Sequence, residues 1–110
     1  MKRSAVTVWK IDIAEQLAQA LLSIDDTQTM QSFLRDVLTE KEIIEISSRL
    51  EAARLLRKGT KYMDVIRATK LSSTTVARIS EWLQGGCGGY AKVLAKLEAH
   101  RSHTPPARAR

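Results

Sequence analysis

The sequence has one cysteine, two prolines and few aromatic residues, and these shortages limit the structures that the chain can form. A single thiol, Cys87, cannot form an internal disulfide bond, which agrees with a reducing cytoplasm. Aromatic residues make up 5% of the chain, so Leu, Ile, Val and Ala must supply most of the core. No run of 18 apolar residues occurs, and Asp12 interrupts the stretch that a signal peptide would need. We therefore expect a cytoplasmic protein of one small domain.

Charge is plentiful but unevenly distributed along the chain. Residues 10–48 hold three basic and eight acidic side chains, a net charge of −5. Residues 49–78 hold eight basic side chains against Glu51 and Asp64, a net charge of +6. Such segregation is typical of a surface that binds a polyanion, although a solvated basic face is the alternative interpretation.

Apolar residues recur at helical spacing along nearly the whole chain and predict an all-α fold of five or six helices without strands. The expected helices span about residues 10–23, 27–37, 39–58, 73–84 and 90–100, with a short helix after Thr60. The last of them is expected to bury Val93, Leu94 and Leu97. The predicted organisation is an N-terminal arm (residues 1–9), a helical domain (residues 10–100) and a disordered basic tail (residues 101–110).

Five residues carry helix start and stop signals. Thr39 and Glu42 have the spacing of a capping box. Gly59 is placed to end that helix in a left-handed conformation, and Thr60 could cap the short helix after it. Ser72 is a good N-cap for the helix that follows the break "TKLS".

The expected helix over residues 39–58 is apolar nearly all round its axis. The residues concerned are Ile43, Ile44, Ile46, Leu50, Ala52, Ala53, Leu55 and Leu56. Such a helix must be buried on all sides, which five or six short helices can hardly achieve in a monomer. We therefore expect a homodimer in which each chain covers the other.

Two short helices at about residues 61–84, separated by a tight break, predict a helix-turn-helix. Val65, Leu71, Val76 and Ile79 stand where such a unit needs apolar residues. Lys70 occupies a turn position with positive φ that glycine favours, and Ile66 replaces a usual small residue. The alternative interpretation is a pair of packed helices with no role in DNA binding.

The polar, basic and small residues of this unit, together with Lys58 just before it, form the candidate DNA-binding set. They are Lys58, Lys61, Arg67, Lys70, Ser72, Ser73, Thr74, Thr75, Ala77 and Arg78. The cations before Ser72 would neutralise phosphates. Base edges would be read by Ser73, Thr74, Thr75 and Ala77. Because these side chains make few bidentate contacts, specificity would come through water or DNA shape.

The stretches "LTEKEIIEISSRLEAARLLRKG" and "TTVARIS" resemble the Trp repressor superfamily. The ending "RISEWLQGGCGGYAKVL" is similar to its uncharacterised YerC/YecD-like branch. The resemblance covers about residues 33–97. It implies an intertwined all-helical homodimer that inserts two recognition helices into successive major grooves of a roughly palindromic site. The implied function is that of a sequence-specific regulator of transcription, a repressor, bound to double-stranded DNA at the nucleoid.

The resemblance also implies a possible effector pocket. In tryptophan-binding members two arginines and two threonines hold the ligand, and Thr39, Arg49, Thr75 and Arg78 match them. Those members have glycine where this chain has Ile79, whose side chain we expect to fill the pocket or to serve as a core residue in place of a ligand. Tryptophan is therefore not the expected effector.

Other kinds of site lack support. The motif "GGCGG" lacks the Gly-Lys-Ser/Thr ending and the preceding strand of a phosphate loop, so its glycines are expected to end one helix and let the last fold back. Cys87, with His100 and His103 remote, falls short of a zinc site. No nucleophile has a recognisable base, so we do not expect an enzyme. We also expect no metal and no cofactor. Trp82 is interpreted as a packing residue. The rival function is a helical protein-interaction module with only non-specific affinity for DNA.

Overall fold

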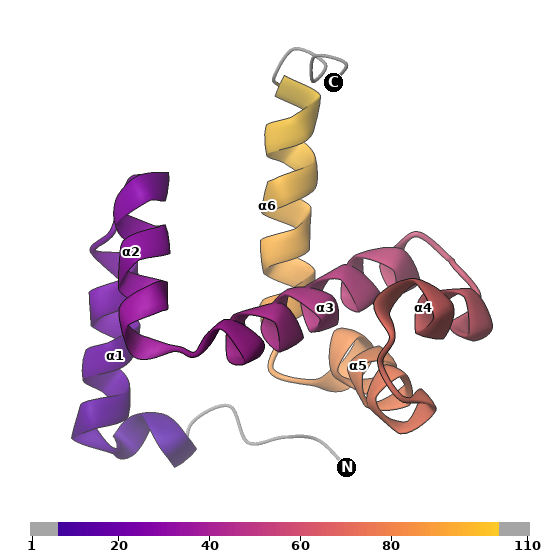
Figure 1. Ribbon diagram of the computed structural model, residues 1–110, viewed down its shortest axis with the longest axis horizontal. Helices are drawn as coiled ribbons and strands as arrows, with labels where there is room; N and C mark the ends of the chain where they lie inside the picture. Colours follow the sequence, from indigo (N-terminus) through magenta and orange to yellow (C-terminus); the bar gives the residue numbers. More distant parts are fainter. Residues whose placement is uncertain (1–6, 104–110) are drawn as a thin grey trace. The chain divides into compact units, whose positions relative to one another are not determined.

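The computed structural model describes residues 7–103, and within them the chain folds entirely into helices (Figure 1). A 3₁₀ helix, η1 (Thr7–Lys10), precedes α1 (Asp12–Leu22), α2 (Thr27–Val37), α3 (Glu40–Arg57), α4 (Tyr62–Thr69), α5 (Ser73–Gly85) and α6 (Gly89–His103). The all-α class and the six α-helices are as predicted. No helix in the described range combines the length and apolarity needed to cross a bilayer. Two compact units divide these residues, at the boundary between Ser48 and Arg49 within α3.

The unit of residues 7–48 owes its local structure to helix caps. The Asp26 carboxylate accepts the Thr29 backbone N–H at 2.8 Å, and this hydrogen bond lowers the pKa of Asp26. The predicted capping box of α3 is confirmed. Glu42 accepts the backbone N–H of Thr39 at 2.8 Å, and Thr39 Oγ1 accepts that of Glu42 at 3.1 Å.

Tertiary burial is missing from this unit. None of the residues 7–48 is buried. Ile13 is 76% exposed, Leu22 79% and Ile44 59%. Helices of this length gain most of their stability from packing an apolar face, so the unit by itself leaves its main source of stability unused.

The unit of residues 49–103 has a core of its own. Its buried apolar residues are Ala52, Ala53 and Leu55 of α3, Val65 of α4, Val76 and Ile79 of α5, and Leu94 of α6. At the surface, Arg57 of α3 pairs with Glu98 of α6 at 3.1 Å. The second half of α3 and the three helices after it therefore share one hydrophobic core.

Burial in α6 is narrower than its apolar pattern predicts. Leu94 is 1% exposed, as expected, but Val93 is 49% and Leu97 45% exposed. The expectation that all three are buried is wrong for the single chain, because the chain's core covers only the Leu94 side of the helix.

The junction between α3 and α4 confirms one signal and corrects another. Gly59 has φ +93°, the predicted left-handed conformation. Thr60 does not cap α4, because its backbone N–H is bonded to the Leu55 carbonyl at 3.0 Å and so belongs to the closing turn of α3. Lys61 takes the N-cap position, without a side-chain hydrogen bond.

The helix ends differ slightly from expectation. The last helix extends to His103, so three residues assigned to the tail, 101–103, are helical, and η1 forms part of the expected N-terminal arm. The rest of the arm, residues 1–6, and the rest of the tail, residues 104–110, lie outside the described residues.

Lys70 adopts the strained turn conformation that the sequence indicated. It has φ 63° and ψ 15°, and among the described residues no other non-glycine residue has positive φ. A left-handed conformation costs an L-residue about 1 kcal/mol, so the lysine is kept here at the expense of stability.

We expect the variant Lys70→Gly to be more stable to unfolding than Lys70→Gln by about 0.5–1 kcal/mol. Both variants remove the same charge, and only glycine relieves the backbone strain. Urea denaturation followed by circular dichroism measures the difference. Equal stability of the two variants, or a more stable glutamine variant, would show that the turn is not strained.

Candidate nucleic-acid interface

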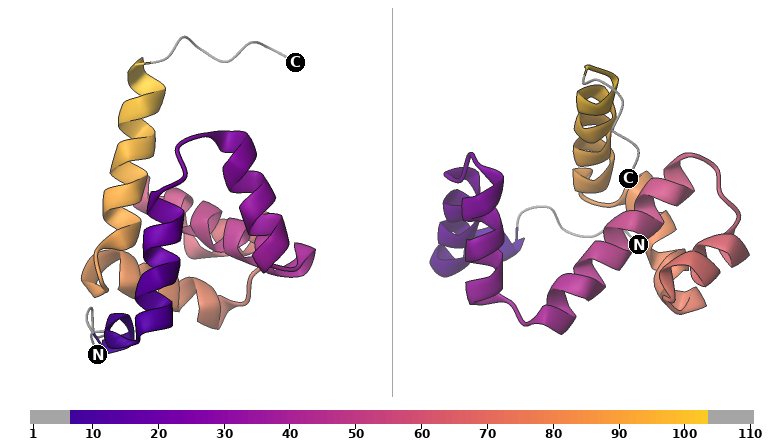
Figure 2. Two further views of the ribbon diagram at one scale, coloured as in Figure 1. Left: turned by 90° about the vertical axis from the view of Figure 1, so that its left-hand side faces the viewer. Right: turned by 45° about the horizontal axis from the view of Figure 1, so that its top comes forward.

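Helices α4 and α5 lie side by side and are joined by the three-residue turn of residues 70–72 (Figures 1 and 2). Thr69 holds this turn from inside. Its buried hydroxyl donates to the Val65 carbonyl at 2.7 Å and accepts the Leu71 backbone N–H at 3.4 Å. The Lys70 backbone N–H closes α4 on the Ile66 carbonyl at 2.8 Å. The two-helix unit is therefore a tightly joined helix-turn-helix, as predicted, and Thr69 is a contributor that the sequence patterns did not single out.

The start of α5 is organised by Ser72. Its Oγ accepts the Thr75 backbone N–H at 3.1 Å, which confirms the predicted N-cap. The same hydroxyl donates to Thr75 Oγ1 at 3.0 Å. Thr75 is half-buried and engaged within the turn, whereas Ser73, Thr74 and Ala77 are exposed. Ser73, Thr74 and Ala77 are therefore more accessible to a DNA groove than Thr75 is.

The cations of the candidate set are all exposed. Lys58 and Lys61 lie in the connection from α3 to α4, Lys70 in the turn and Arg78 on α5. Arg67 on α4 pairs with Asp64 at 3.1 Å, so its charge is partly offset. Of the eight positive charges counted in the sequence, three belong to ion-paired arginines on α3 and α4 and three to exposed lysines around the helix-turn-helix. The other two are Arg49 of α3 and the exposed Arg78 of α5.

The five residues of the possible effector pocket have different environments. Ile79 is fully buried and belongs to the hydrophobic core. Arg78 is exposed, Thr75 bonds to Ser72, and Thr39 closes the capping box of α3. Of the five, Arg49 alone lines a described pocket, and that pocket is a different one.

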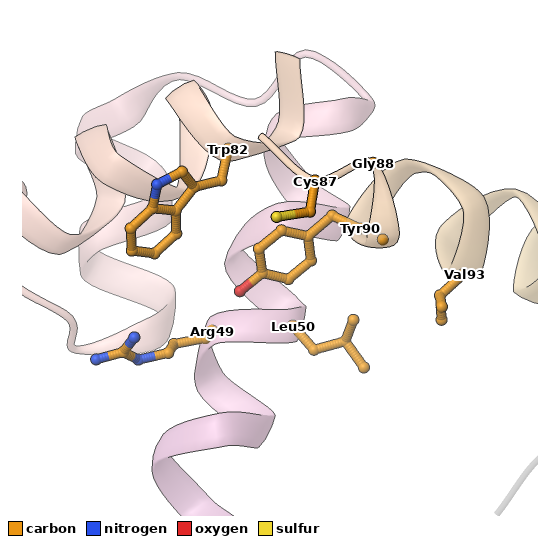
Figure 3. A pocket seen from close by; sticks show the side chains of 8 residues that line it. Arg49, Leu50, Trp82, Cys87, Gly88, Tyr90 and Val93 are labelled. Atoms are coloured by element: carbon orange, nitrogen blue, oxygen red, sulfur yellow. The ribbon is translucent and has the colours of Figure 1, made fainter. Parts of the chain in front are cut away.

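This pocket has a volume of about 460 Å³ and is formed by α3, α5 and α6 with the loop between the last two (Figure 3). Its lining residues are Arg49, Leu50, Trp82, Cys87, Gly88, Gly89, Tyr90 and Val93. Trp82 packs against the core, as predicted, and also forms one wall. No spacing pattern predicts the pocket, because Arg49 and Tyr90 are far apart in the chain; the glycine-rich loop is the sequence feature that lies nearest to it.

The glycine-rich loop shapes this region through backbone geometry. A Cβ atom at Gly86 would lie 2.6 Å from the Trp82 carbonyl oxygen, so only glycine allows the chain to leave α5 here. Gly88 has φ +87° just before α6 begins. The glycines end α5 and turn the chain into α6, as expected. Within the described residues, no group of three or more His, Cys, Asp or Glu side chains could hold a metal ion.

Comparisons with known proteins agree with this geometry. A family model described as Trp repressor protein matches residues 13–98. The chain is 32% identical over 84 residues to the uncharacterised protein YerC of Bacillus subtilis strain 168. The aligned residues cover 76% of this chain and 81% of YerC. The crystal structure of a TrpR-like protein from Eubacterium eligens ATCC 27750 matches with a TM-score of 0.78 at 36% identity, over 84% of this chain and 95% of that one.

A further crystal structure, that of a candidate Trp repressor from Staphylococcus aureus, matches with a TM-score of 0.79 over 87% of this chain and 96% of that one. At 23% identity it supports the fold alone. Fold and helix-turn-helix together define the class of helix-turn-helix regulators of transcription. Within that class, the chain belongs to the Trp repressor family.

Shortening Ile79 tests whether its side chain is a core element. We expect Ile79→Val to lower the free energy of unfolding by about 1 kcal/mol and Ile79→Ala by about 3 kcal/mol, because each leaves a cavity in a fully buried site. The neighbouring exposed Arg78→Ala should stay within about 0.5 kcal/mol of the parent. Chemical denaturation measures all three. An Ile79→Ala protein as stable as Arg78→Ala would mean that the site is open space.

Proposed function

We propose that the protein is a homodimeric, sequence-specific regulator of transcription that binds double-stranded DNA through α4 and α5, acts at the nucleoid and does not require tryptophan. Repression is the proposed outcome, because a dimer seated on an operator blocks access to it. The observation that carries the proposal is the start of α5: a Ser72-capped helix with exposed Ser73, Thr74 and Ala77, next to exposed lysines.

The roles of the polar residues follow from their environments. Lys58, Lys61 and Lys70 contact phosphates, where exposed cations release counterions and make affinity salt-dependent. Ser73, Thr74 and Ala77 face base edges, directly or through water. Thr75, already bonded to Ser72, supports the helix start more than it reads a base.

Independence from tryptophan is supported by the core. Ile79 is 0% exposed and packs in the same core as Val76 and Val65. A ligand at this point would have to displace a side chain whose removal leaves a cavity, so α5 is held in place by the protein's own packing.

A homodimer is supported by the apolar surface that one chain leaves uncovered. The exposed large side chains include Ile13, Leu17, Leu22, Ile44, Ile46, Val93 and Leu97. Monomeric proteins rarely leave so much apolar surface in contact with water, and residues 7–48 bury nothing by themselves. A second copy of the chain would cover these side chains and complete the core.

DNA recognition is tested by selecting binding sites from random double-stranded DNA at physiological salt, with and without tryptophan. We expect the same palindromic motif in both arms, with half-sites about 34 Å apart. Thr74→Ala should reduce discrimination at one position per half-site by about tenfold. Lys61→Gln should weaken binding to all sequences alike and lower the salt slope by about one.

The matched control is Lys96→Gln, which removes an exposed charge from α6 and should leave both affinity and motif unchanged. Enrichment of a motif only when tryptophan is present would contradict tryptophan independence. A protein that enriches no motif and loses all DNA as salt rises would instead be the interaction module with non-specific affinity.

The dimer is tested separately with Ile44→Glu, which places a carboxylate at an exposed apolar position of α3. If that position is covered by a second copy, the unpaired buried charge should weaken the dimer by about 3 kcal/mol, or more than about a hundredfold. Lys41→Gln, one turn away, should have no such effect. Sedimentation velocity over a range of concentrations reports the outcome, and a parent protein that sediments as a monomer throughout would refute the dimer.

A further inference from the structure

The turn between α4 and α5 contains a lysine where glycine would be less strained. Lys70 has φ 63° and ψ 15°, and no other non-glycine residue of the described range has positive φ. Its side chain is exposed and, within the same range, takes part in no ion pair. Packing inside the chain therefore does not account for a lysine in this conformation, and such strain is typical of functional positions.

The two peptide groups that flank Lys70 are both held by hydrogen bonds. The Lys70 N–H, which belongs to the peptide group before it, donates to the Ile66 carbonyl at 2.8 Å. The Leu71 N–H, which belongs to the peptide group after it, donates to Thr69 Oγ1 at 3.4 Å. Because φ and ψ describe how these two planar groups are rotated relative to one another, holding both of them fixes the conformation of Lys70.

The second of these contacts depends on the side chain of Thr69. Its hydroxyl donates to the Val65 carbonyl at 2.7 Å, which leaves the oxygen lone pairs to accept the Leu71 N–H. Thr69 is 8% exposed, so water competes little for either hydrogen bond. Leu71 is half-buried against the core, and removing the hydroxyl would therefore deprive its N–H of this acceptor where water has limited access.

We propose that Thr69 is a positioning residue for a phosphate contact made by Lys70, an inference that rests on the proposed function. By holding the Leu71 amide, the Thr69 hydroxyl keeps Lys70 in the left-handed conformation. That conformation sets the direction in which the lysine side chain leaves the turn, two residues before the N-cap of α5. A lysine stem has many rotamers, so a fixed starting direction reduces the conformational freedom that is lost when the ammonium group binds a phosphate.

The conformational part of the proposal is tested on the full chain without DNA. Thr69→Val removes the hydroxyl and keeps nearly the same shape, whereas Thr69→Ser keeps the hydroxyl. Because the contact between Thr69 and Leu71 is long, amide hydrogen exchange is used to measure its strength directly. We expect the Leu71 amide to exchange at least about tenfold faster in Thr69→Val and within about twofold of the parent in Thr69→Ser.

The conformation of Lys70 itself is followed by NMR in the same samples. Positive φ brings the amide and α protons of a residue close together and gives a strong nuclear Overhauser effect between them. This signal of Lys70 should remain strong in the parent and in Thr69→Ser, and should weaken in Thr69→Val.

The functional part is tested by affinity for a labelled duplex that carries the motif enriched from random DNA, at several salt concentrations. Lys70→Gln should weaken binding by about fivefold per chain and lower the salt slope by about one per chain, because one phosphate contact is lost. Thr69→Val should change both quantities in the same direction, with at least about twofold weaker binding, and Thr69→Ser should match the parent. The double variant should bind no more weakly than Lys70→Gln, since a residue that acts through Lys70 has no effect without it.

The matched control is Ser80→Ala. Ser80 is also 8% exposed, but it lies on α5 about two helical turns beyond Ser72. Removing its hydroxyl should leave the Leu71 exchange rate, the affinity and the salt slope unchanged. Circular dichroism checks that every variant is folded. Should Thr69→Val fail to fold, Thr69→Ala removes the same hydroxyl and replaces it in both parts.

The outcomes separate this inference from the proposed function. Unchanged exchange of the Leu71 amide in Thr69→Val would show that the hydroxyl does not hold the turn. An equal effect of Thr69→Val on the parent and on Lys70→Gln would show that Thr69 does not act through Lys70. Either result overturns the inference, as does a Thr69→Val protein that binds the duplex as well as a DNA-binding parent. A parent that binds no DNA would instead refute the proposed function, and the inference with it.

Discussion

The structure depends on one shared hydrophobic core, in which Ile79 and Val76 of α5 are buried together with Ala52 and Ala53 of α3. All four residues are fully buried. Close-packed protein interiors resist displacement of their side chains. Because α4 joins the same core through Val65, this core also holds the helix-turn-helix. The surface proposed for recognition is therefore built on hydrophobic packing.

Much of this arrangement could be predicted from the sequence, because it is encoded locally. The capping box of Thr39 and Glu42, the cap at Ser72 and the positive φ of Gly59 and Lys70 each depend on residues within a few positions of one another. The buried positions of the helix-turn-helix follow from helical periodicity in the same way. One local signal led to a wrong prediction. Thr60 does not cap α4, because its backbone N–H is bonded to the Leu55 carbonyl at the end of α3.

What the sequence did not reveal depends on contacts between distant residues. The pocket needs Arg49 from α3 beside Trp82 and Tyr90, which no spacing rule brings together. Burial along α6 failed for a related reason. Periodicity identifies an apolar face, but whether Val93 is covered depends on what lies opposite it, and the described residues leave Val93 49% exposed. The candidate DNA contacts remain predictions, supported by exposure and charge.

The contrast between the two units has a consequence for how the chain is made. Ribosomes release the N-terminal residues first, and domains commonly fold in that order. Here residues 7–48, which are made earlier, include no buried residue, whereas the core begins at Ala52 and includes Leu94 in the first half of α6. The core therefore cannot be complete until the chain has been synthesised through Leu94. Until then, the helices of residues 7–48 have exposed apolar faces that chaperones and proteases can recognise.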